Sequence, residues 1–237
     1  MKAMPSYPNP LLAGWRMPPG VPGANLWYRF NQVGYQAATA AFLRVRVFNR
    51  HYEPARGSAL YVCNHQSYFD PPLMALGLRR PINFMARWSL FRVPLFGRFI
   101  ASLKAFPVKR GAADMAAMKE ALRRLRRGEQ LVVFPEGTRT YDGRVGQFLP
   151  GVALLARRGA DWVVPTAVEG AYDVWPRSQS LPTPGHVAIA YCRPMGRDEV
   201  ADLTNDELIV TMRRRIIDML NYMRHRRGKP PLQPADE

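Results

Sequence analysis

The sequence predicts an α/β fold, a mixed and mostly parallel sheet flanked by helices, preceded by an N-terminal amphipathic helix. Short apolar segments typical of buried strands alternate with helical segments along the chain. The composition is that of a globular protein, with 47% hydrophobic and 22% charged residues. A length of 237 residues suits one large domain with a short appendage, or two small domains.

The N-terminal region divides into a leader and a helix. Residues 1–23 are rich in proline and glycine, which predicts a flexible or irregular leader. Residues 24–41 have helical periodicity, with an apolar face made by Leu26, Phe30, Val33, Ala37 and Ala40. This face suits either a lipid headgroup boundary or the domain core. We therefore expect a leader with an amphipathic, possible membrane helix over 1–41 and the main domain over 42–237.

The main domain alternates strands with helices. Alternating residues from Phe42 to Val47 predict a half-buried strand, and ALYVC at 59–63 predicts a short buried strand. A helix is expected to open at Pro71 and Pro72, since proline is tolerated in a first helical turn. Further helices are expected at 113–127, 150–158 and from Thr204, where Glu207 has the spacing of a capping box. Further strands are expected at 131–134, 163–168 and 186–191.

Charge and cysteine content restrict the class of partner and the compartment. The chain has 34 Lys plus Arg against 18 Asp plus Glu, a formal charge of +16. Such an excess favours nucleic acid, an anionic membrane or phosphorylated substrates, unless it reflects an arginine-rich proteome. Cys63 and Cys192 are far apart and have no metal-ligand spacing, so no disulfide framework is expected and a reducing compartment fits. No signal peptide and no membrane-spanning helix are expected, because the apolar runs are too short.

Two polar motifs follow predicted buried strands. His65 comes directly after the strand at 59–63, and Asp70 follows five positions later. Histidine is the usual general base near neutral pH, and a carboxylate on its other ring nitrogen orients it. Because no serine or cysteine with a recognisable nucleophile motif accompanies the pair, the attacking hydroxyl would belong to the substrate. The spacing alone also fits a histidine that caps a helix.

The second motif, Phe134 to Arg139, follows the strand at 131–134. Gly137 permits a tight loop, Glu136 can accept hydrogen bonds from substrate hydroxyls, and Arg139 can bind a phosphate with paired donors. A third and weaker motif is Val108-Lys109-Arg110-Gly111, where adjacent cations beside a glycine suit an anion.

Together, the three motifs resemble the glycerolipid acyltransferase family typified by lysophosphatidic acid acyltransferase. Asn64-His65-Gln66-Ser67-Tyr68-Phe69-Asp70 matches its NHxSxxD (HX4D) block, 108–111 its second block, and Phe134-Pro135-Glu136-Gly137-Thr138-Arg139 its FPEGTR block. Val164-Pro165-Thr166-Ala167 is similar to the fourth block. The resemblance covers roughly residues 45–192.

The resemblance implies the reaction and the residues that carry it. The chain would transfer a fatty acyl group from acyl-CoA or acyl-carrier protein to the hydroxyl of a lysophosphatidic acid in phospholipid biosynthesis, without cofactor or metal. His65 would be the base and Asp70 its partner. Pro165 would lie near the acyl-binding region. The other residues expected to bind substrate are Asn64, Arg110, Glu136, Gly137, Thr138 and Arg139.

One departure concerns the acceptor. Where the family often has Phe-Lys-x-Gly after the FPEGTR block, this chain has Phe148-Leu149-Pro150-Gly151. The missing cation leaves other acceptors open, such as a lyso-ornithine lipid, another lysophospholipid or a sugar lipid. A less favoured alternative is a non-catalytic basic protein that binds nucleic acid or membrane. No zinc spacing or RNA-binding motif is found, so nucleic acid is not expected. The expected location is the cytoplasmic face of a membrane, in peripheral or monotopic attachment.

Overall fold

The computed structural model describes residues 6–7, 25–109 and 114–233. Apart from Ser6–Tyr7, the leader predicted over residues 1–23 lies outside the described residues. The predicted division at residue 41 stays a prediction.

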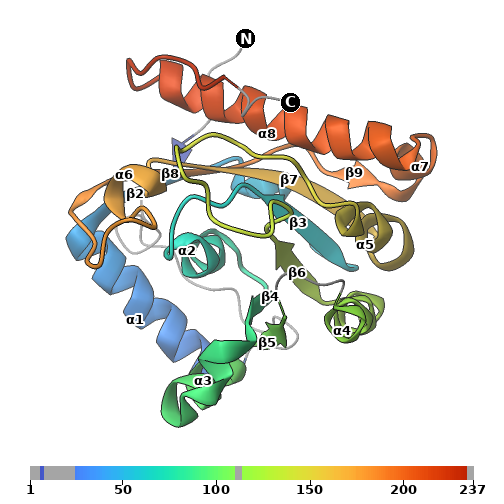
Figure 1. Ribbon diagram of the computed structural model, residues 1–237, viewed down its shortest axis with the longest axis horizontal. Helices are drawn as coiled ribbons and strands as arrows, with labels where there is room; N and C mark the ends of the chain where they lie inside the picture. Colours follow the sequence, from blue (N-terminus) through green and yellow to red (C-terminus); the bar gives the residue numbers. More distant parts are fainter. Residues whose placement is uncertain (1–5, 8–24, 110–113, 234–237) are drawn as a thin grey trace.

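The described strands form one nine-stranded sheet in the order β1-β2-β8-β7-β3-β6-β4-β5, with β9 paired to β7 (Figure 1). The run β7-β3-β6-β4-β5 is parallel, as is the pair β2-β8, whereas β8 and β9 are antiparallel to β7 and β1 is antiparallel to β2. The bounds are β1 Ser6–Tyr7, β2 Leu43–Phe48, β3 Ala59–Cys63, β4 Ile82–Arg87, β5 Ala105–Val108, β6 Gln130–Val133, β7 Trp162–Glu169, β8 Gly185–Tyr191 and β9 Met195–Gly196. The predicted mixed, mostly parallel sheet is confirmed.

Helices cover both faces of the sheet (Figure 1). One buried apolar cluster includes side chains of α4, α5 and α8, and the second includes those of α2 and α6. The sheet therefore lies between two apolar layers, which explains why β3 is buried at every position. The bounds are α1 Leu26–Phe42, α2 Asp70–Gly77, α3 Pro94–Ser102, α4 Met115–Arg126, α5 Gly151–Gly159, α6 Ala171–Val174, α7 Arg197–Ala201 and α8 Asn205–His225, with 3₁₀ turns η1 Arg50–Tyr52 and η2 Trp88–Arg92.

Each helix and strand predicted within the described residues is present, with ends that differ by one or two residues. The Thr204 side chain caps α8, and the Glu207 side chain accepts from the Thr204 N–H, as the capping-box spacing predicted. The segment from 82 to 108 was not divided into elements by the sequence pattern. It folds as β4, η2, α3 and β5, which extend the parallel sheet to its edge.

Helix α1 turns its polar face toward the body of the protein. Gln32 is buried, and its Nε2 donates to the carbonyls of Ala75 and Leu78 in and after α2. Leu26 and Phe30, on the predicted apolar face, are 85% and 69% exposed. The alternative in which the apolar face packs on the core is therefore wrong for these residues.

Candidate active site

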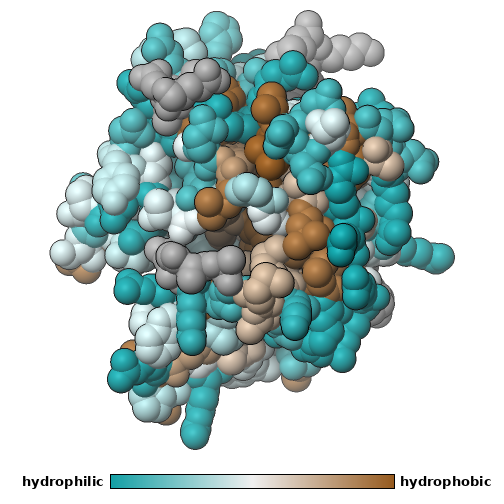
Figure 2. Space-filling view, turned by 45° about the vertical axis from the view of Figure 1, so that its right-hand side comes forward, coloured by the Kyte–Doolittle hydropathy of each residue, from teal (hydrophilic) through white to brown (hydrophobic). Residues whose placement is uncertain are grey.

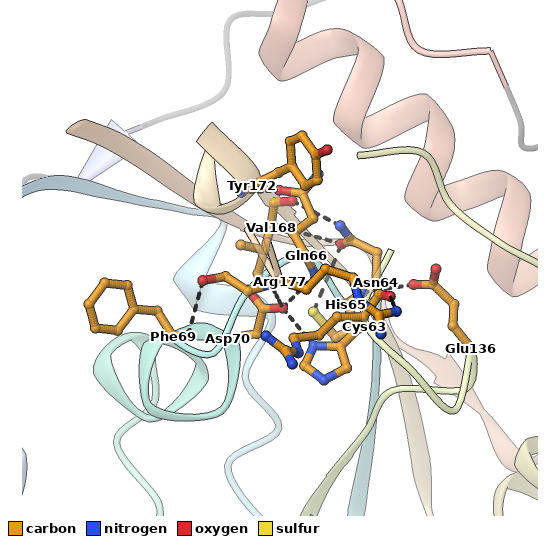
Figure 3. Close-up of polar contacts among 12 residues, drawn as sticks. Cys63, Asn64, His65, Gln66, Phe69, Asp70, Glu136, Val168, Tyr172 and Arg177 are labelled. Carbon is orange, nitrogen blue, oxygen red and sulfur yellow. Dashed lines mark hydrogen bonds and ion pairs between the residues drawn. The ribbon is translucent and has the colours of Figure 1, made fainter. Parts of the chain in front are cut away.

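The His65 and Asp70 side chains meet at the carboxyl end of β3. His65 Nδ1 lies 2.7 Å from Asp70 Oδ2 (Figure 3). Because a carboxylate only accepts hydrogen bonds, Nδ1 carries the proton and Nε2 is left as the basic nitrogen. His65 is 7% exposed and Asp70 is fully buried. The pair therefore has the geometry of a general base and the carboxylate that orients it.

The loop between the two residues is closed by Asp70 itself. Its Oδ2 also accepts from the backbone N–H groups of Gln66 and Ser67, at 2.6 and 2.7 Å. Asp70 is the first residue of α2, and Pro71 and Pro72 follow it in the first turn. Proline fits there because the first N–H groups of a helix have no partner within the helix. A single carboxylate oxygen thus fixes both the loop and the imidazole.

Asn64 joins the loop to the neighbouring strand. Its amide donates to the Val168 carbonyl at 2.9 Å and accepts from the Val168 N–H at 2.8 Å. The residue is buried, so both polar groups of the side chain are occupied by the β7 backbone. The amide therefore supports the loop that carries His65, and the expectation that Asn64 binds substrate stays a prediction.

The FPEGTR loop holds the backbone of His65 from the other side. The Glu136 Oε1 accepts from the His65 N–H at 2.7 Å, and Oε2 accepts from the Gly146 N–H at 2.9 Å. The Thr140 N–H donates to the His65 carbonyl at 2.8 Å. Two motifs 71 residues apart in the chain thus form one site. Both Glu136 oxygens thus accept from backbone N–H groups, and the expected contact of Glu136 with substrate hydroxyls stays a prediction.

Burial raises the pKa of Glu136 to about 7, and the nearby Asp70 carboxylate acts in the same direction. The hydrogen bonds from Gly146 and His65 oppose that shift because they favour the charged form. The charge on the carboxyl that holds the His65 backbone therefore changes near neutral pH.

Gly137 makes the tight turn that the motif predicts. Its φ is +69°, and its N–H donates to the Phe134 carbonyl at 3.0 Å. A Cβ built on Gly137 would lie 2.9 Å from Leu149 Cδ1. Leu149, where the family often has lysine, therefore lies directly against this turn.

Arg139 lies against an aromatic ring instead of a carboxylate. Its guanidinium carbon is 3.4 Å from the centroid of the Tyr68 ring, and its Nη1 is buried without a hydrogen-bond partner in the described structure. Arg139 and Thr138 line a depression of about 180 Å³, together with Glu136, Thr140, Tyr141, Arg144, Gly146 and Gln147. A guanidinium with an unpartnered nitrogen beside a depression suits an anionic group.

The expected roles of Arg110 and Pro165 stay predictions. Arg110 lies outside the described residues. Pro165 lies in the middle of β7, opposite Val62 of β3, and its carbonyl accepts from the Cys192 N–H. Its expected place near the acyl-binding region stays a prediction.

Several residues that shape the site carried no separate signal in the sequence. The Phe134 ring stacks on the His65 imidazole at 4.2 Å between centroids, and Trp175 packs against Tyr68 at 4.9 Å. Arg177 donates to the Arg139 carbonyl at 3.4 Å. Phe134 and Tyr68 belong to the matched sequence blocks, so their place near the site could have been predicted from the sequence. Trp175 and Arg177 follow α6, more than 100 residues after His65, and only folding brings them there.

The nearest serine and cysteine are not poised as nucleophiles. The Ser67 hydroxyl donates to the Trp175 carbonyl at 2.9 Å. Cys63 is fully buried, and burial raises the pKa of its thiol well above its ordinary value. A protonated, buried thiol is unreactive. The geometry therefore favours an attacking hydroxyl that arrives with a substrate.

No group of three or more His, Cys, Asp or Glu side chains in the described ranges is arranged to hold a metal ion. The absence of a metal requirement stays a prediction.

Comparison with known proteins agrees with the site geometry. The chain is 29% identical to the chloroplastic 1-acyl-sn-glycerol-3-phosphate acyltransferase LPAT1 of Arabidopsis thaliana, over 62% of this chain and 42% of the relative. It is 27% identical to the 1-acyl-sn-glycerol-3-phosphate acyltransferase of Bacillus subtilis, over 71% of this chain and 82% of the relative. The match therefore spans less than half of the plant protein and most of the bacterial one.

A solved structure and a family model extend this similarity. The crystal structure of the 1-acyl-sn-glycerophosphate (LPA) acyltransferase PlsC from Thermotoga maritima matches with a TM-score of 0.73 and 25% identity, over 83% of this chain and 79% of that chain. The family model described as Acyltransferase matches residues 44–169. That range contains His65, Asp70 and the whole FPEGTR block, and it covers more than half of the chain. The chain belongs to the Acyltransferase family.

Proposed function

We propose that this protein transfers a fatty acyl group from a thioester to the free hydroxyl of a lysophosphatidic acid, as a step of phospholipid biosynthesis. The observation that carries the proposal is the 2.7 Å contact between His65 and the buried Asp70, beside the FPEGTR loop. The names of the relatives, which describe 1-acyl-sn-glycerol-3-phosphate acyltransferases, support it.

The proposed reaction uses His65 Nε2, the ring nitrogen that does not contact Asp70. His65 Nε2 accepts the proton of the acceptor hydroxyl as its oxygen attacks the thioester carbonyl. Asp70 stabilises the imidazolium that forms. When the tetrahedral intermediate collapses, the carbon–sulfur bond breaks, and the imidazolium returns the proton to the leaving thiolate. General-base assistance of this kind contributes on the order of 10²- to 10⁴-fold in rate.

Arg139 is the proposed ligand of the acceptor phosphate. Its face is occupied by the Tyr68 ring, which leaves its N–H edge for an anion. The acyl chain needs apolar surface, and Figure 2 shows apolar residues gathered around a hollow on the side that carries α4 and α5. Both acyl-CoA and acyl-carrier protein remain proposed donors.

We also propose attachment to the cytoplasmic face of a membrane through what we call the α1–α3 surface, made by exposed Leu26, Phe30, Val33, Val93, Leu95 and Phe99. The Trp27 indole N–H donates to the Ser102 hydroxyl at 2.9 Å, which joins α1 to α3. Exposed Arg87, Arg92 and Arg98 lie in or beside η2 and α3, where they complement anionic lipid. No helix of the described ranges is long and apolar enough to cross a bilayer.

The acyltransferase proposal is tested by mass spectrometry of the products. Lysophosphatidic acid with acyl-CoA, and separately with acyl-carrier protein, should give phosphatidic acid, and His65→Ala should abolish the product while thermal unfolding stays cooperative. A panel with a lyso-ornithine lipid, other lysophospholipids and a sugar lipid tests the head group. Equal activity of His65→Ala, or thiol release without an acylated product, would contradict the proposal.

The membrane proposal needs a separate measurement. Vesicles of phosphatidylglycerol and phosphatidylcholine should sediment the wild-type protein, and the double variant Phe30→Gln/Leu95→Gln should stay in the supernatant. Val210→Gln is the matched control, since Val210 is an exposed apolar residue on α8. Unchanged sedimentation of the double variant would refute attachment through this surface.

A further inference from the structure

A second guanidinium lies beside Arg139. Arg177 is in the segment between α6 and β8, after the residues matched by the family model. Its Nη1 donates to the Arg139 carbonyl at 3.4 Å, and Figure 3 draws it with His65 and Asp70. Two arginines from distant segments thus meet at one edge of the site.

Both guanidinium groups are held by tyrosine rings. Arg177 Cζ lies 3.7 Å from the centroid of the Tyr141 ring, and Arg139 Cζ lies 3.4 Å from that of Tyr68. The Tyr172 hydroxyl donates to the Tyr141 carbonyl at 2.7 Å and so fixes the position of that residue. Stacking occupies the face of a guanidinium and leaves the N–H groups at its edge for hydrogen bonds.

Neither guanidinium is neutralised in the described part of the chain. The ion pairs found there include no partner for Arg139 or Arg177, and the nearby Asp142 pairs with Arg144. The buried, unpartnered Nη1 of Arg139 is a second sign of a missing ligand. Donors of this kind are costly to leave unpaired and are therefore expected to meet an acceptor.

We propose that Arg177 joins Arg139 in binding a phosphate group of the substrates. This inference rests on the proposed acyl transfer, in which two phosphates are available. One is the phosphate monoester of the acceptor, and the other belongs to CoA or to the phosphopantetheine of a carrier protein. The role proposed for Arg177 is substrate binding and not catalysis, since no described contact joins its guanidinium to His65 or Asp70.

The test measures binding without turnover. Calorimetry on His65→Ala, with glycerol 3-phosphate and with CoA as separate probes, compares the protein with and without Arg177→Gln. Loss of charge-assisted hydrogen bonds in Arg177→Gln should lower the affinity for one or both probes about ten- to hundredfold. Weakening of glycerol 3-phosphate alone assigns the acceptor phosphate, and weakening of CoA alone assigns the donor. Arg177→Lys, which keeps charge but loses the planar fork, should be intermediate.

Arg126→Gln is the control for loss of one positive charge, because Arg126 is exposed on α4. It should leave both probes unchanged. If Arg177→Gln binds both probes within twofold of its parent, the inference is overturned. The calorimetric assay needs no reaction. If the protein shows no acyltransferase activity, the proposed function is refuted, and the calorimetry still tests whether Arg177 binds phosphate.

Discussion

Replacing Asp70 by Asn tests the dyad with the smallest change of shape. The buried Oδ2 accepts from the His65 ring and from two backbone N–H groups, at 2.6 to 2.7 Å. An amide oxygen can occupy the same position and keep the three contacts. The new NH₂ group then takes the place of Oδ1, which is buried and has no hydrogen-bond partner in the described structure. An unsatisfied buried donor costs about 1–3 kcal/mol of stability.

The effect on catalysis should be larger than the effect on stability. A carboxylate and an imidazolium whose charge centres are about 4 Å apart attract by about 4 kcal/mol at an effective dielectric constant of 20. Asn removes this attraction when the imidazolium forms. Because about 1.4 kcal/mol corresponds to a tenfold change in rate, kcat should fall about 10³-fold.

Two measurements separate the effects. Thiol release from acyl-CoA in the presence of lysophosphatidic acid gives kcat, and urea unfolding gives stability. Asp206→Asn is the control, since Asp206 is an exposed carboxylate at the start of α8. A kcat for Asp70→Asn above one tenth of wild type, at saturating substrates, would refute the role assigned to the Asp70 charge.

Three further substitutions test how the site is supported. The pKa of Glu136 is raised to about 7, so the proton bound by the native state contributes stability that is present below about pH 4.5 and is lost as the pH rises through 7. Between pH 5 and pH 8, the free energy of unfolding of the wild-type protein should therefore fall by up to about 3 kcal/mol relative to that of Glu136→Gln. Parallel curves of unfolding free energy against pH for the two proteins would contradict this. Gly137→Ala should lower the free energy of unfolding in urea by about 1–2 kcal/mol because φ is +69°, and an unchanged midpoint would argue against a required left-handed turn. Asn64→Ala leaves the Val168 N–H and carbonyl without their side-chain partner and should cost about 1–3 kcal/mol for each group left unsatisfied, with a lower kcat; full activity at lowered stability would show that the contact does not position His65.

Local sequence patterns were sufficient for most of the fold. The buried strand ALYVC was predicted at its observed bounds, because five apolar residues bounded by polar ones fit a strand covered on both faces. The segment from 82 to 108 was missed, since each of its two strands is buried only in its first two residues and is partly or fully exposed in the rest. Helix α1 was found, but its orientation was not, because periodicity shows two faces and does not tell which one meets the protein.

The candidate site residues also divide into those whose role local sequence patterns suggested and those whose partners lie far away in the chain. The five-residue spacing of His65 and Asp70 suggested a dyad, since a short loop ending in a helix can bring the two together. The use of Glu136 was not predictable, because its partners include a backbone N–H 71 residues away. The same holds for Asn64, whose partner is 104 residues away. A polar side chain in a motif looks alike in sequence whether it faces substrate or backbone.

The amino-acid sequence by itself determined most of the order of strands and helices, the excess of positive charge and the candidate pair of an imidazole and a carboxylate. Tertiary structure alone decided which polar groups are already occupied by the protein and which are left for a ligand. Asn64 and Glu136 are held by backbone, whereas Arg139 and Arg177 lie on tyrosine rings and have no carboxylate partner in the described residues. The physical reason is that hydrogen bonding depends on distance in space, and local patterns in a chain carry little information about distant partners.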